Sequence, residues 1–285
     1  MSKLLNKGGY GCIYYPGIKC TGESTGDYLT KLVNVNNGKN EINISKMVKK
    51  IPNYIKYFSP IESWCTISSS KLSVPICSSV NTKNEYTILK KPYVHTVPVL
   101  LTIPFILTLY QELKQSIQIL IRNKIVHFDI KKYNILFSPF PIIIDFGISF
   151  SIKKVLSNLP KCFYLYAPEE DNWPIDVHIL SYIINVGKLT DESVRKTCTI
   201  FVKNHRIFKK QTAKYRKNYL DQCIQYYSTF IPMNDNILEL IKGWKTWDMY
   251  GLATFIINLI QSKEPGHPFK DKMLDLLHYN PYKRI

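Results

Sequence analysis

The sequence predicts an α+β fold in two parts, a strand-rich beginning and a longer helical remainder. The chain has 285 residues, of which 45% are hydrophobic and 13% aromatic, enough to bury a sizeable core. Roughly its first ninety residues consist of short strand-like segments between turn signals, and helical periodicity takes over from about Pro104. We therefore place a small part at residues 1–91 and a larger part at residues 92–285.

Strands are expected in the first part where β-branched and aromatic residues cluster between turn residues. The expected strands are 13–15, 28–33, 64–67 and 86–89. A short helix is expected over residues 41–50, because Pro52 cannot continue it.

The second part begins with a helix. Apolar residues recur at three- and four-residue steps between Leu107 and Ile121, which predicts a helix that ends near Lys124. Two hydrophobic strands and further helices are expected after it, at 134–137, 141–144, 248–260 and 270–277.

The net charge limits the partners of this chain. It is +17, from 38 Lys and Arg against 21 Asp and Glu, which favours phosphate groups, acidic protein segments, nucleic acid or anionic membranes. No stretch reaches the roughly 18–20 apolar residues of a membrane-spanning helix, and the N-terminus lacks the apolar segment of a secretory signal. We expect a soluble, intracellular, cytoplasmic protein without a membrane partner.

The cysteines suggest neither a disulfide framework nor a zinc site. There are seven, an odd number, and they are scattered without a C-x-x-C pair. We expect reduced thiols that pack as small hydrophobic groups.

Four polar residues after the first long helix have the chemistry of phosphoryl transfer. That reaction needs positioned cations and an acceptor held in line with the transferred group. Asp129 could accept the proton of an incoming hydroxyl, and Lys131 could offset developing negative charge. Asn134 and Asp145 carry the hard oxygen ligands that Mg²⁺ prefers. The alternative, polar caps of strand ends, explains less well why all four are in register.

This stretch resembles the catalytic loop and the metal-binding loop of eukaryotic-type protein kinases. The family patterns are H-R-D-x-K-x-x-N and D-F-G, and the chain has HFDIKKYN at 127–134 and DFG at 145–147. The eleven-residue spacing, bridged by apolar residues, strengthens the match. The resemblance implies a bilobal kinase-like fold, with a β-rich N-lobe at 1–91 and a helical C-lobe at 92–285. It also implies ATP with Mg²⁺ or Mn²⁺ as cofactors.

The N-terminus resembles the kinase glycine-rich loop. In NKGGYGCIY at 6–14, Gly8 and Gly11 match the second and third glycines of that loop, with Gly9 between them. Glycine lets backbone N–H groups approach phosphates, and Ile13 is expected to cover the adenine. Asn6 replaces the first glycine, and an ordinary hairpin turn is the alternative explanation.

Lys31 resembles the strand lysine that holds the α- and β-phosphates in this family, and an exposed strand lysine is the alternative. Glu41 is its expected carboxylate partner on the following helix. The separation of ten residues is shorter than is usual in the family.

Three later segments extend the resemblance to the end of the chain. YAPE at 166–169 resembles the A-P-E motif, and Asp248 begins a D-x-W-S-L-G-like helix whose aspartate braces the catalytic loop. Asp176 is a rival for that position. NPYKR at 280–284 resembles D-P-x-x-R, which implies an ion pair between Glu169 and Arg284.

The chain also departs from the family pattern. Phe128 replaces the arginine of H-R-D, so we expect constitutive activity or control by a partner. An inserted segment at about 171–245 is expected to be helical and is rich in lysine, arginine and tyrosine. It could dock an acidic substrate or nucleic acid, or be a solvated face over a tyrosine-lined core. This layout resembles divergent protein kinases of large DNA viruses, which would imply host cytoplasm or virion.

These features favour a serine/threonine protein kinase, with Lys131 as the reason for preferring Ser/Thr over Tyr. Its partner would be a protein substrate, acidic or associated with nucleic acid; the sequence does not specify an oligomeric state. A small-molecule phosphotransferase of the aminoglycoside or choline type is one alternative, but that group generally lacks Lys131, A-P-E and the terminal arginine. A pseudokinase acting as a basic binding or scaffold module is the other, favoured by Asn6 and Phe128.

Overall fold

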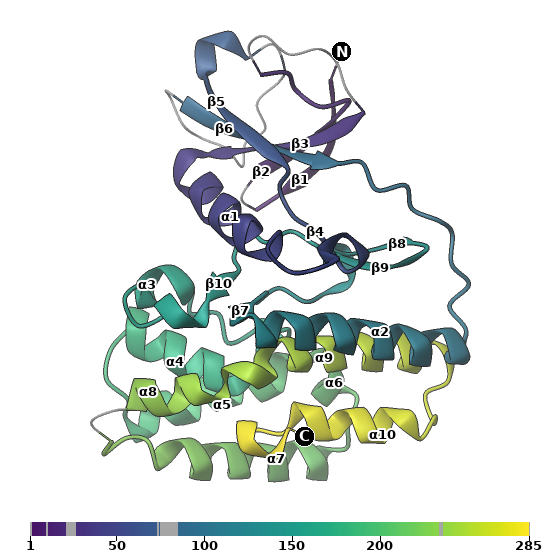
Figure 1. Cartoon of the computed structure of the whole chain (residues 1–285). Helices are drawn as coiled ribbons and strands as arrows, with labels where there is room; N and C mark the ends of the chain where they lie inside the picture. The colour runs from purple at the N-terminus through teal and green to yellow at the C-terminus, as the bar shows by residue number, and fades with distance from the viewer. Residues whose placement is uncertain are drawn as a thin grey trace. The chain divides into compact units, whose positions relative to one another are not determined.

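The computed structural model describes residues 2–9, 11–20, 27–72, 74, 85–233 and 236–284. The chain forms two compact units. The first comprises Met1–Val99 and Asn134–Ser149, and the second comprises Leu100–Tyr133 and Phe150–Ile285. Strands dominate the first unit and helices the second, so the predicted α+β class is confirmed (Figure 1). The sequence analysis placed residues 134–149 in the second part, whereas in the structure they belong to the first unit.

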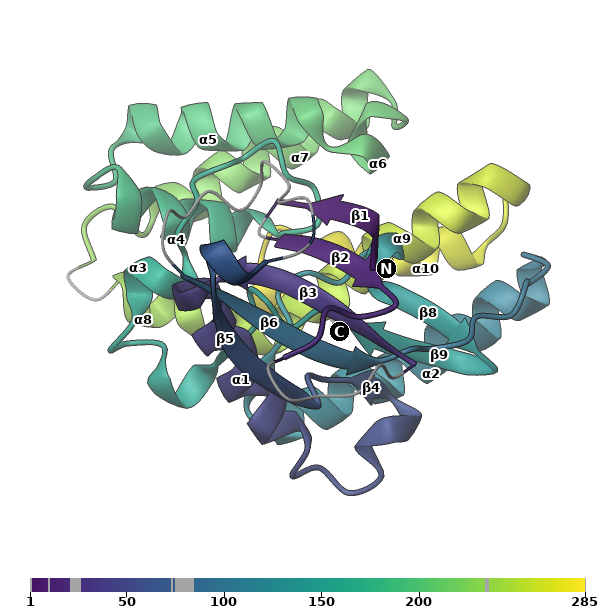
Figure 2. The same ribbon diagram turned by 90° about the horizontal axis from the view of Figure 1, so that it is seen from above.

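The first unit is built on a five-stranded antiparallel sheet, which Figure 2 shows from above. In spatial order its strands are β1 (Lys3–Gly8), β2 (Gly11–Tyr15), β3 (Tyr28–Asn34), β6 (Glu85–Pro92) and β5 (Ser63–Ser68). The four predicted strands are confirmed. Strand β1 was not predicted, because its residues KLLNKG are exposed throughout and include no β-branched or aromatic side chain.

Helix α1 (Val35–Val48) follows β3 without a loop. The predicted start at residue 41 was wrong, because Asn34 caps the helix: its side-chain oxygen accepts a hydrogen bond from the Asn37 amide at 2.9 Å. Gly38 lets α1 approach the sheet closely, since a Cβ there would lie 2.9 Å from Thr87 Cβ on β6. The segment NNGKN resembles a turn in sequence, yet it forms the first turns of the helix.

A second, three-stranded sheet completes the first unit, with strand order β4-β9-β8. The two predicted strands are present as β8 (Ile135–Ser138) and β9 (Phe140–Ile144), which form an antiparallel hairpin, and β4 (Phe58–Ser59) lies parallel to β9. Two 3-10 turns also belong to this unit, η1 (Tyr54–Lys56) and η2 (Ser69–Lys71).

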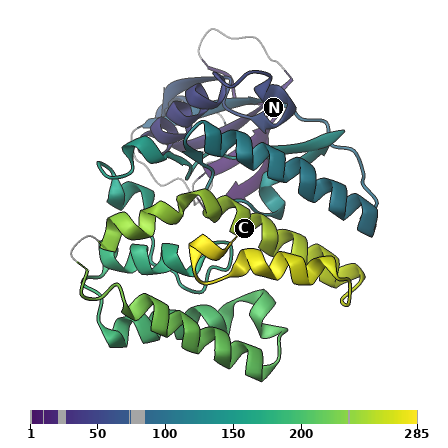
Figure 3. The ribbon, with the colours of Figure 1, turned by 60° about the horizontal axis from the view of Figure 1, so that its bottom comes forward.

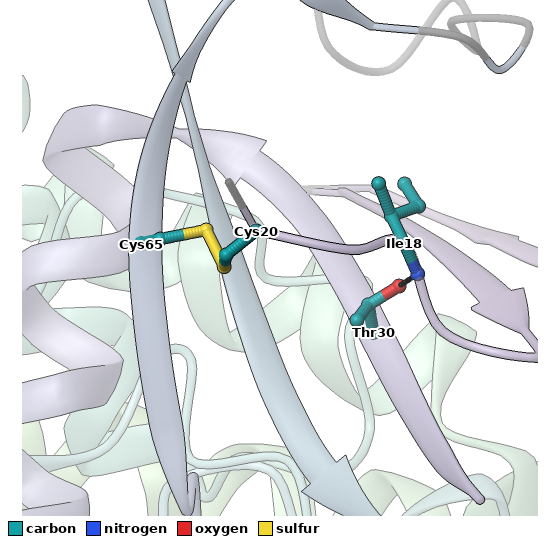
Figure 4. Close-up of a disulfide and its surroundings, with 4 residues drawn as sticks. All are labelled: Ile18, Cys20, Thr30 and Cys65. Carbon is teal, nitrogen blue, oxygen red and sulfur yellow. Dashed lines mark hydrogen bonds between the residues drawn. A yellow bond between two sulfur atoms is a disulfide. The ribbon is translucent and has the colours of Figure 1, made fainter. Parts of the chain in front are cut away.

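A disulfide joins Cys20 to Cys65, so the prediction of reduced thiols was wrong at this pair (Figure 4). The segment after β2 crosses the sheet and is held by a hydrogen bond from the Ile18 amide to Thr30 Oγ1 at 2.9 Å. This brings the two cysteine Cα atoms to 6.1 Å, within bridging distance, although 45 residues separate them in sequence. Their spacing alone contains no signal of that proximity.

The second unit is mainly helical (Figure 3). Its α-helices are α2 (Ile103–Arg122), α3 (Leu159–Cys162), α4 (Ile175–Asn185), α5 (Asp191–Asn204), α6 (Arg206–Lys209), α7 (Ala213–Ser228), α8 (Asn236–Ile241), α9 (Trp247–Lys263) and α10 (Phe269–Leu274). Short segments connect them, namely β7 (Ile125–Val126), β10 (Phe150–Ser151), η3 (Lys132–Asn134), η4 (Ile152–Lys154), η5 (Lys242–Thr246), η6 (Asp275–Leu277) and η7 (Pro281–Lys283). The predicted helices at 104–124, 248–260 and 270–277 are confirmed, the last with a 3-10 end.

Helix α9 is the centre of this unit. Most of its residues are buried, and it packs against α2. The predicted insertion at 171–245 is helical, with α5 and α7 side by side (Figure 3). Tyrosines of α7 belong to the core: the Tyr219 and Tyr227 hydroxyls donate to the carbonyls of Leu277 and Tyr279, each at 2.7 Å.

Among the residues that the structure describes, no helix combines the length and apolar character needed to cross a membrane.

Candidate functional site

The first unit contains a buried cluster of charged side chains that includes three predicted site residues. Lys31 projects from β3, Glu41 from α1, and Asp145 directly follows β9. Lys31 Nζ lies 3.1 Å from Glu41 Oε2 and 2.7 Å from Asp145 Oδ1. The Lys31 and Glu41 side chains are 7% and 2% exposed, whereas the Asp145 side chain is 35% exposed. The cluster is therefore buried on one side and open at Asp145.

Local structure holds Asp145 in this position. Its backbone has a positive φ of 66°, unusual for a residue with a side chain. The Gly147 amide donates to Asp145 Oδ1 at 3.2 Å, and a Cβ on Gly147 would lie 3.1 Å from that oxygen. The Asn40 side chain on α1 donates to the Gly147 carbonyl at 2.9 Å. The DFG segment is thereby attached to the helix that carries Glu41.

A fourth member of the cluster, Lys91 on β6, was not predicted. Its Nζ lies 2.7 Å from Glu41 Oε1, within ion-pair distance, although the angle does not meet that of a hydrogen bond. The strand register explains its position. Lys31 pairs with Leu89 and Leu29 with Lys91, so both lysines project from the same face of the sheet. Side chains alternate between the two faces of a strand, so the sequence of β6 could have placed Lys91 on the face of Lys31 only if the pairing of β3 with β6 had been known.

The charges in the cluster shift the pKa values of its members. Burial alone would lower the pKa of Lys31, but the nearby charges of Glu41 and Asp145 outweigh it and raise that pKa. Burial would raise the pKa of Asp145, but Lys31 and Lys91 together hold it well below its ordinary range. Both side chains are therefore charged at neutral pH.

Asn134 and Asp145 lie at the same end of the β8–β9 hairpin. The register pairs Ile135 with Ile143, so its continuation sets buried Asn134 opposite Ile144, next to Asp145. The described residues contain no group of three or more His, Cys, Asp or Glu side chains that could hold a metal. Mg²⁺ is usually bound by one or two protein oxygens together with water and phosphates. An amide and a carboxylate oxygen at one hairpin end fit that requirement.

The glycine-rich segment forms the β1–β2 hairpin. Gly8 pairs with Gly11 across its turn, where Gly8 and Gly9 are exposed; Tyr10 lies outside the described residues. Gly11 has a packing role, since a Cβ there would lie 2.6 Å from Val33 Cγ1. Ile13 pairs directly with Lys31, so these two side chains share a face of the sheet.

The second unit holds the other two predicted catalytic residues. Lys131 Nζ lies 2.8 Å from Asp129 Oδ1, and both side chains are partly exposed. Asp248 on α9 fixes the preceding backbone: its two carboxylate oxygens accept from the amides of His127 and Phe128, each at 2.8 Å. The predicted bracing role of Asp248, in preference to Asp176, is confirmed.

Phe128 occupies an aromatic core. It adopts a positive φ of 68°, and its carbonyl accepts a hydrogen bond from Trp173 Nε1 at 2.7 Å. Its ring stacks on Trp173 with centroids 4.9 Å apart and also contacts Phe163 and Trp247. A phenylalanine packed among aromatic side chains thus stands where the H-R-D motif has arginine. The backbone before Asp129 is held at both its amide and its carbonyl groups.

The predicted ion pair between Glu169 and Arg284 was wrong. Glu169 is exposed, and Arg284 instead pairs with Asp176 on α4 at 2.6 Å, with both side chains at most 1% exposed. Asp176 is the better partner because it is buried beside Trp247, whose Nε1 donates to it at 2.6 Å. The arginine also donates to the carbonyls of His278 and Tyr279, at 2.6 and 3.1 Å. The sequence motif located the arginine but not its carboxylate.

Known protein families include no match for this chain, and no relative is found among curated proteins. Its function has to be inferred from its residues and their geometry. In the first unit a lysine lies between two carboxylates, one of them partly exposed, at the hairpin end that also carries Asn134. Such an arrangement can bind an anionic group together with a divalent cation.

Proposed function

We propose that this chain is a protein kinase that transfers the γ-phosphate of ATP to serine or threonine. The observation that carries the proposal is the contact of Lys31 with both Glu41 and Asp145, at 3.1 and 2.7 Å. These residues were predicted from three separate segments of the sequence, and a lysine so placed can contact nucleotide phosphates.

The nucleotide would be held by the first unit. Lys31 would neutralise its phosphates, and the exposed backbone at Gly8 and Gly9 would cover them. Ile13, which pairs with Lys31 across the β2–β3 ladder, would contact the adenine. Asn134 and Asp145 would hold Mg²⁺ or Mn²⁺, and the metal would offset negative charge on the transferred group.

Asp129 would be the catalytic base and would orient the substrate hydroxyl, with Lys131 next to the transferred phosphoryl group. This role of Asp129 is supported by Asp248, which accepts hydrogen bonds from the amides of His127 and Phe128, each at 2.8 Å, and so holds the backbone that leads into Asp129. Lys131 Nζ lies 2.8 Å from Asp129 Oδ1, so this ion pair can hold the carboxylate in position before substrate binds.

A bilobal kinase-like fold, with a resemblance to divergent kinases of large DNA viruses, is part of this proposal. So are a protein substrate and a location in the cytoplasm or a virion. The net charge of +17 supports an acidic substrate. Tyr219 and Tyr227 are buried and donate hydrogen bonds, so one side of the insertion packs into the core. Its lysine-rich side would then contact such a substrate.

The test is incorporation of labelled phosphate from Mg-ATP into generic acidic and basic protein substrates, with analysis of the phosphorylated amino acid. Phosphoserine or phosphothreonine is expected from the wild type, and Asp129→Asn should abolish it. Asp221→Asn, at an exposed carboxylate on α7, is the matched control and should keep full activity.

Two results would contradict the proposal. If wild type and Asp129→Asn are equally inert while nucleic acid binds tightly, the chain is a basic binding module. If only a small metabolite is phosphorylated, it is a small-molecule phosphotransferase.

A further inference from the structure

Glu41 is shared between two buried lysines of the first unit. Lys31 Nζ lies 3.1 Å from one carboxylate oxygen and Lys91 Nζ lies 2.7 Å from the other. The Lys91 side chain is 11% exposed and the Glu41 side chain 2% exposed. Since a buried carboxylate needs a countercharge, Lys91 satisfies Glu41 even when Lys31 turns toward another anion.

Lys91 also changes the charge of the whole cluster. Lys31, Glu41 and Asp145 alone carry one positive and two negative charges, a sum of −1. With Lys91 the four side chains sum to zero. Through Glu41 the charge of Lys91 belongs to the same cluster as the partly exposed Asp145. An approaching anion therefore meets a neutral cluster rather than a negative one, before any metal is bound.

We propose that Lys91 makes this cluster a site that binds a nucleoside triphosphate without a divalent cation. The inference rests on the proposed nucleotide site and adds its metal requirement: the metal would be needed for phosphoryl transfer, not for nucleotide binding. Lys91 acts here through its charge and its pairing with Glu41, and it lies on the same sheet face as Lys31 and Ile13.

The expected size of the effect follows from the charge of the ligand. Electrostatic energy scales with the product of charges, and a triphosphate carries about four negative charges alone but about two with Mg²⁺. Loss of one positive charge should thus weaken metal-free binding by about 100-fold, and binding with Mg²⁺ by only about tenfold.

The test compares three variants in nucleotide binding, measured by calorimetry with ATP, once in excess Mg²⁺ and once in EDTA. Lys91→Met removes the charge and keeps an apolar stem, whereas Lys91→Arg keeps the charge. Lys90→Met is the matched control: Lys90 lies on the same strand, is similarly buried, and points to the other face, with its Nζ 5.0 Å from the Tyr28 ring centroid. Thermal unfolding of each variant checks that it folds.

The wild type is expected to bind ATP in EDTA within about tenfold of its affinity in Mg²⁺. Lys91→Met should lose metal-free binding selectively, while Lys91→Arg and Lys90→Met keep it. If the wild type binds only with Mg²⁺, or if Lys91→Met and Lys90→Met behave alike, the inference is wrong and the kinase proposal stands. If the folded wild type binds no ATP in either condition, the proposed nucleotide site itself is wrong.

Discussion

Each unit of the molecule contains a buried arrangement of opposite charges, and these two arrangements differ in how completely their groups are satisfied. In the second unit Arg284 and Asp176 are at most 1% exposed, and the guanidinium also donates to neighbouring carbonyl and hydroxyl oxygens. In the first unit two lysines contact two carboxylates, and the Asp145 side chain remains 35% exposed. One arrangement is closed and the other is open at an edge.

The difference indicates which arrangement serves structure and which serves function. A planar guanidinium with fixed partners on several sides cannot exchange them without loss of many hydrogen bonds. A lysine is a compact charge on a flexible stem, so it can turn from one carboxylate to an incoming anion at small cost. Burial alone therefore does not identify a site; burial together with an open edge and exchangeable partners does.

The largest expected effect comes from the open cluster. Asp145→Asn keeps the size of the side chain but removes the proposed metal ligand and a partner of Lys31. Phosphate incorporation should fall by about a thousandfold or more, which is about 4 kcal/mol in the activation free energy. The thermal unfolding midpoint should fall as well, because the ionised Asp145 carboxylate pairs with buried Lys31 and stabilises the fold at neutral pH. Activity is therefore compared at a temperature at which the variant is folded.

The matched control for this variant is Glu62→Gln, at a carboxylate of the same unit whose side chain is 45% exposed and pairs with Lys49. It should leave activity unchanged. Equal activity of Asp145→Asn and wild type would remove the functional distinction between the two arrangements.

The closed pair should show the opposite behaviour. Arg284→Met leaves the Asp176 carboxylate buried without its cation, and should lower the free energy of unfolding by about 3–5 kcal/mol. Urea denaturation measures this, with exposed Lys283→Met as the control at the neighbouring position.

A second substitution tests whether the unpaired charge is the cause. Asp176→Asn combined with Arg284→Met should be less destabilising than Arg284→Met alone, because no buried charge remains. Additive losses would mean that packing, and not charge pairing, dominates at this site.

The disulfide distinguishes the units in another way. Cys20–Cys65 lies in the first unit, whereas the free cysteines among the described residues, Cys162, Cys198 and Cys223, all lie in the second. A bridge closing a loop of this length contributes about 2–4 kcal/mol. Cys20→Ser, Cys65→Ser and the double variant should each lose that amount in chemical denaturation, since the first substitution already removes the bond. A double variant twice as destabilised as either single would show that the bond does not form.

The smallest expected effect concerns acid. Burial lowers the pKa of His178 to about 4 and that of His205 to about 3, against an ordinary value near 6.5. Below about pH 6.5 these two histidines bind protons in the unfolded chain but stay neutral in the folded chain. The free energy of unfolding of the second unit therefore decreases as the pH falls. Each should contribute about 2 kcal/mol of loss between pH 7 and pH 5.

The first unit should respond at lower pH, because the lowered pKa of Asp145 stabilises the fold above about pH 4 and that contribution is lost only below it.

Tryptophan emission reports mainly the second unit, which holds Trp173, Trp244 and Trp247. His205→Gln should reduce the acid sensitivity of that signal, and His95→Gln, whose side chain is 78% exposed, should not. Identical pH profiles for all three proteins would refute this assignment.

Local patterns in the sequence predicted most of the elements. Periodicity located α2, because its apolar face repeats at the period of a helix, and clusters of β-branched and aromatic residues between turn residues located the strands β2, β3, β5 and β6. The predicted start of α1 failed because Asn and Gly favour turns, and only the Asn34 cap and the contact of Gly38 with Thr87 make a helix favourable there.

The candidate site was predictable where a motif fixes both members of a contact. Lys31 with Glu41, and Asp248 with the backbone at 127–128, are of this kind. Lys91, the Asp176–Arg284 pair and the disulfide depend on which segments become neighbours in space, and a single sequence does not contain that information. The motif even suggested the wrong carboxylate for Arg284, because it cannot show that Glu169 faces solvent.

The backbone at Phe128 has a consequence for regulation. Its amide is bound by Asp248, its carbonyl by Trp173, and its ring is 3% exposed in an aromatic core. The peptide that carries Asp129 is therefore anchored by groups that come together as the polypeptide folds. If the proposed kinase activity is correct, we expect a newly synthesised copy to be active without prior phosphorylation, so that control would act through its abundance, its location or its target.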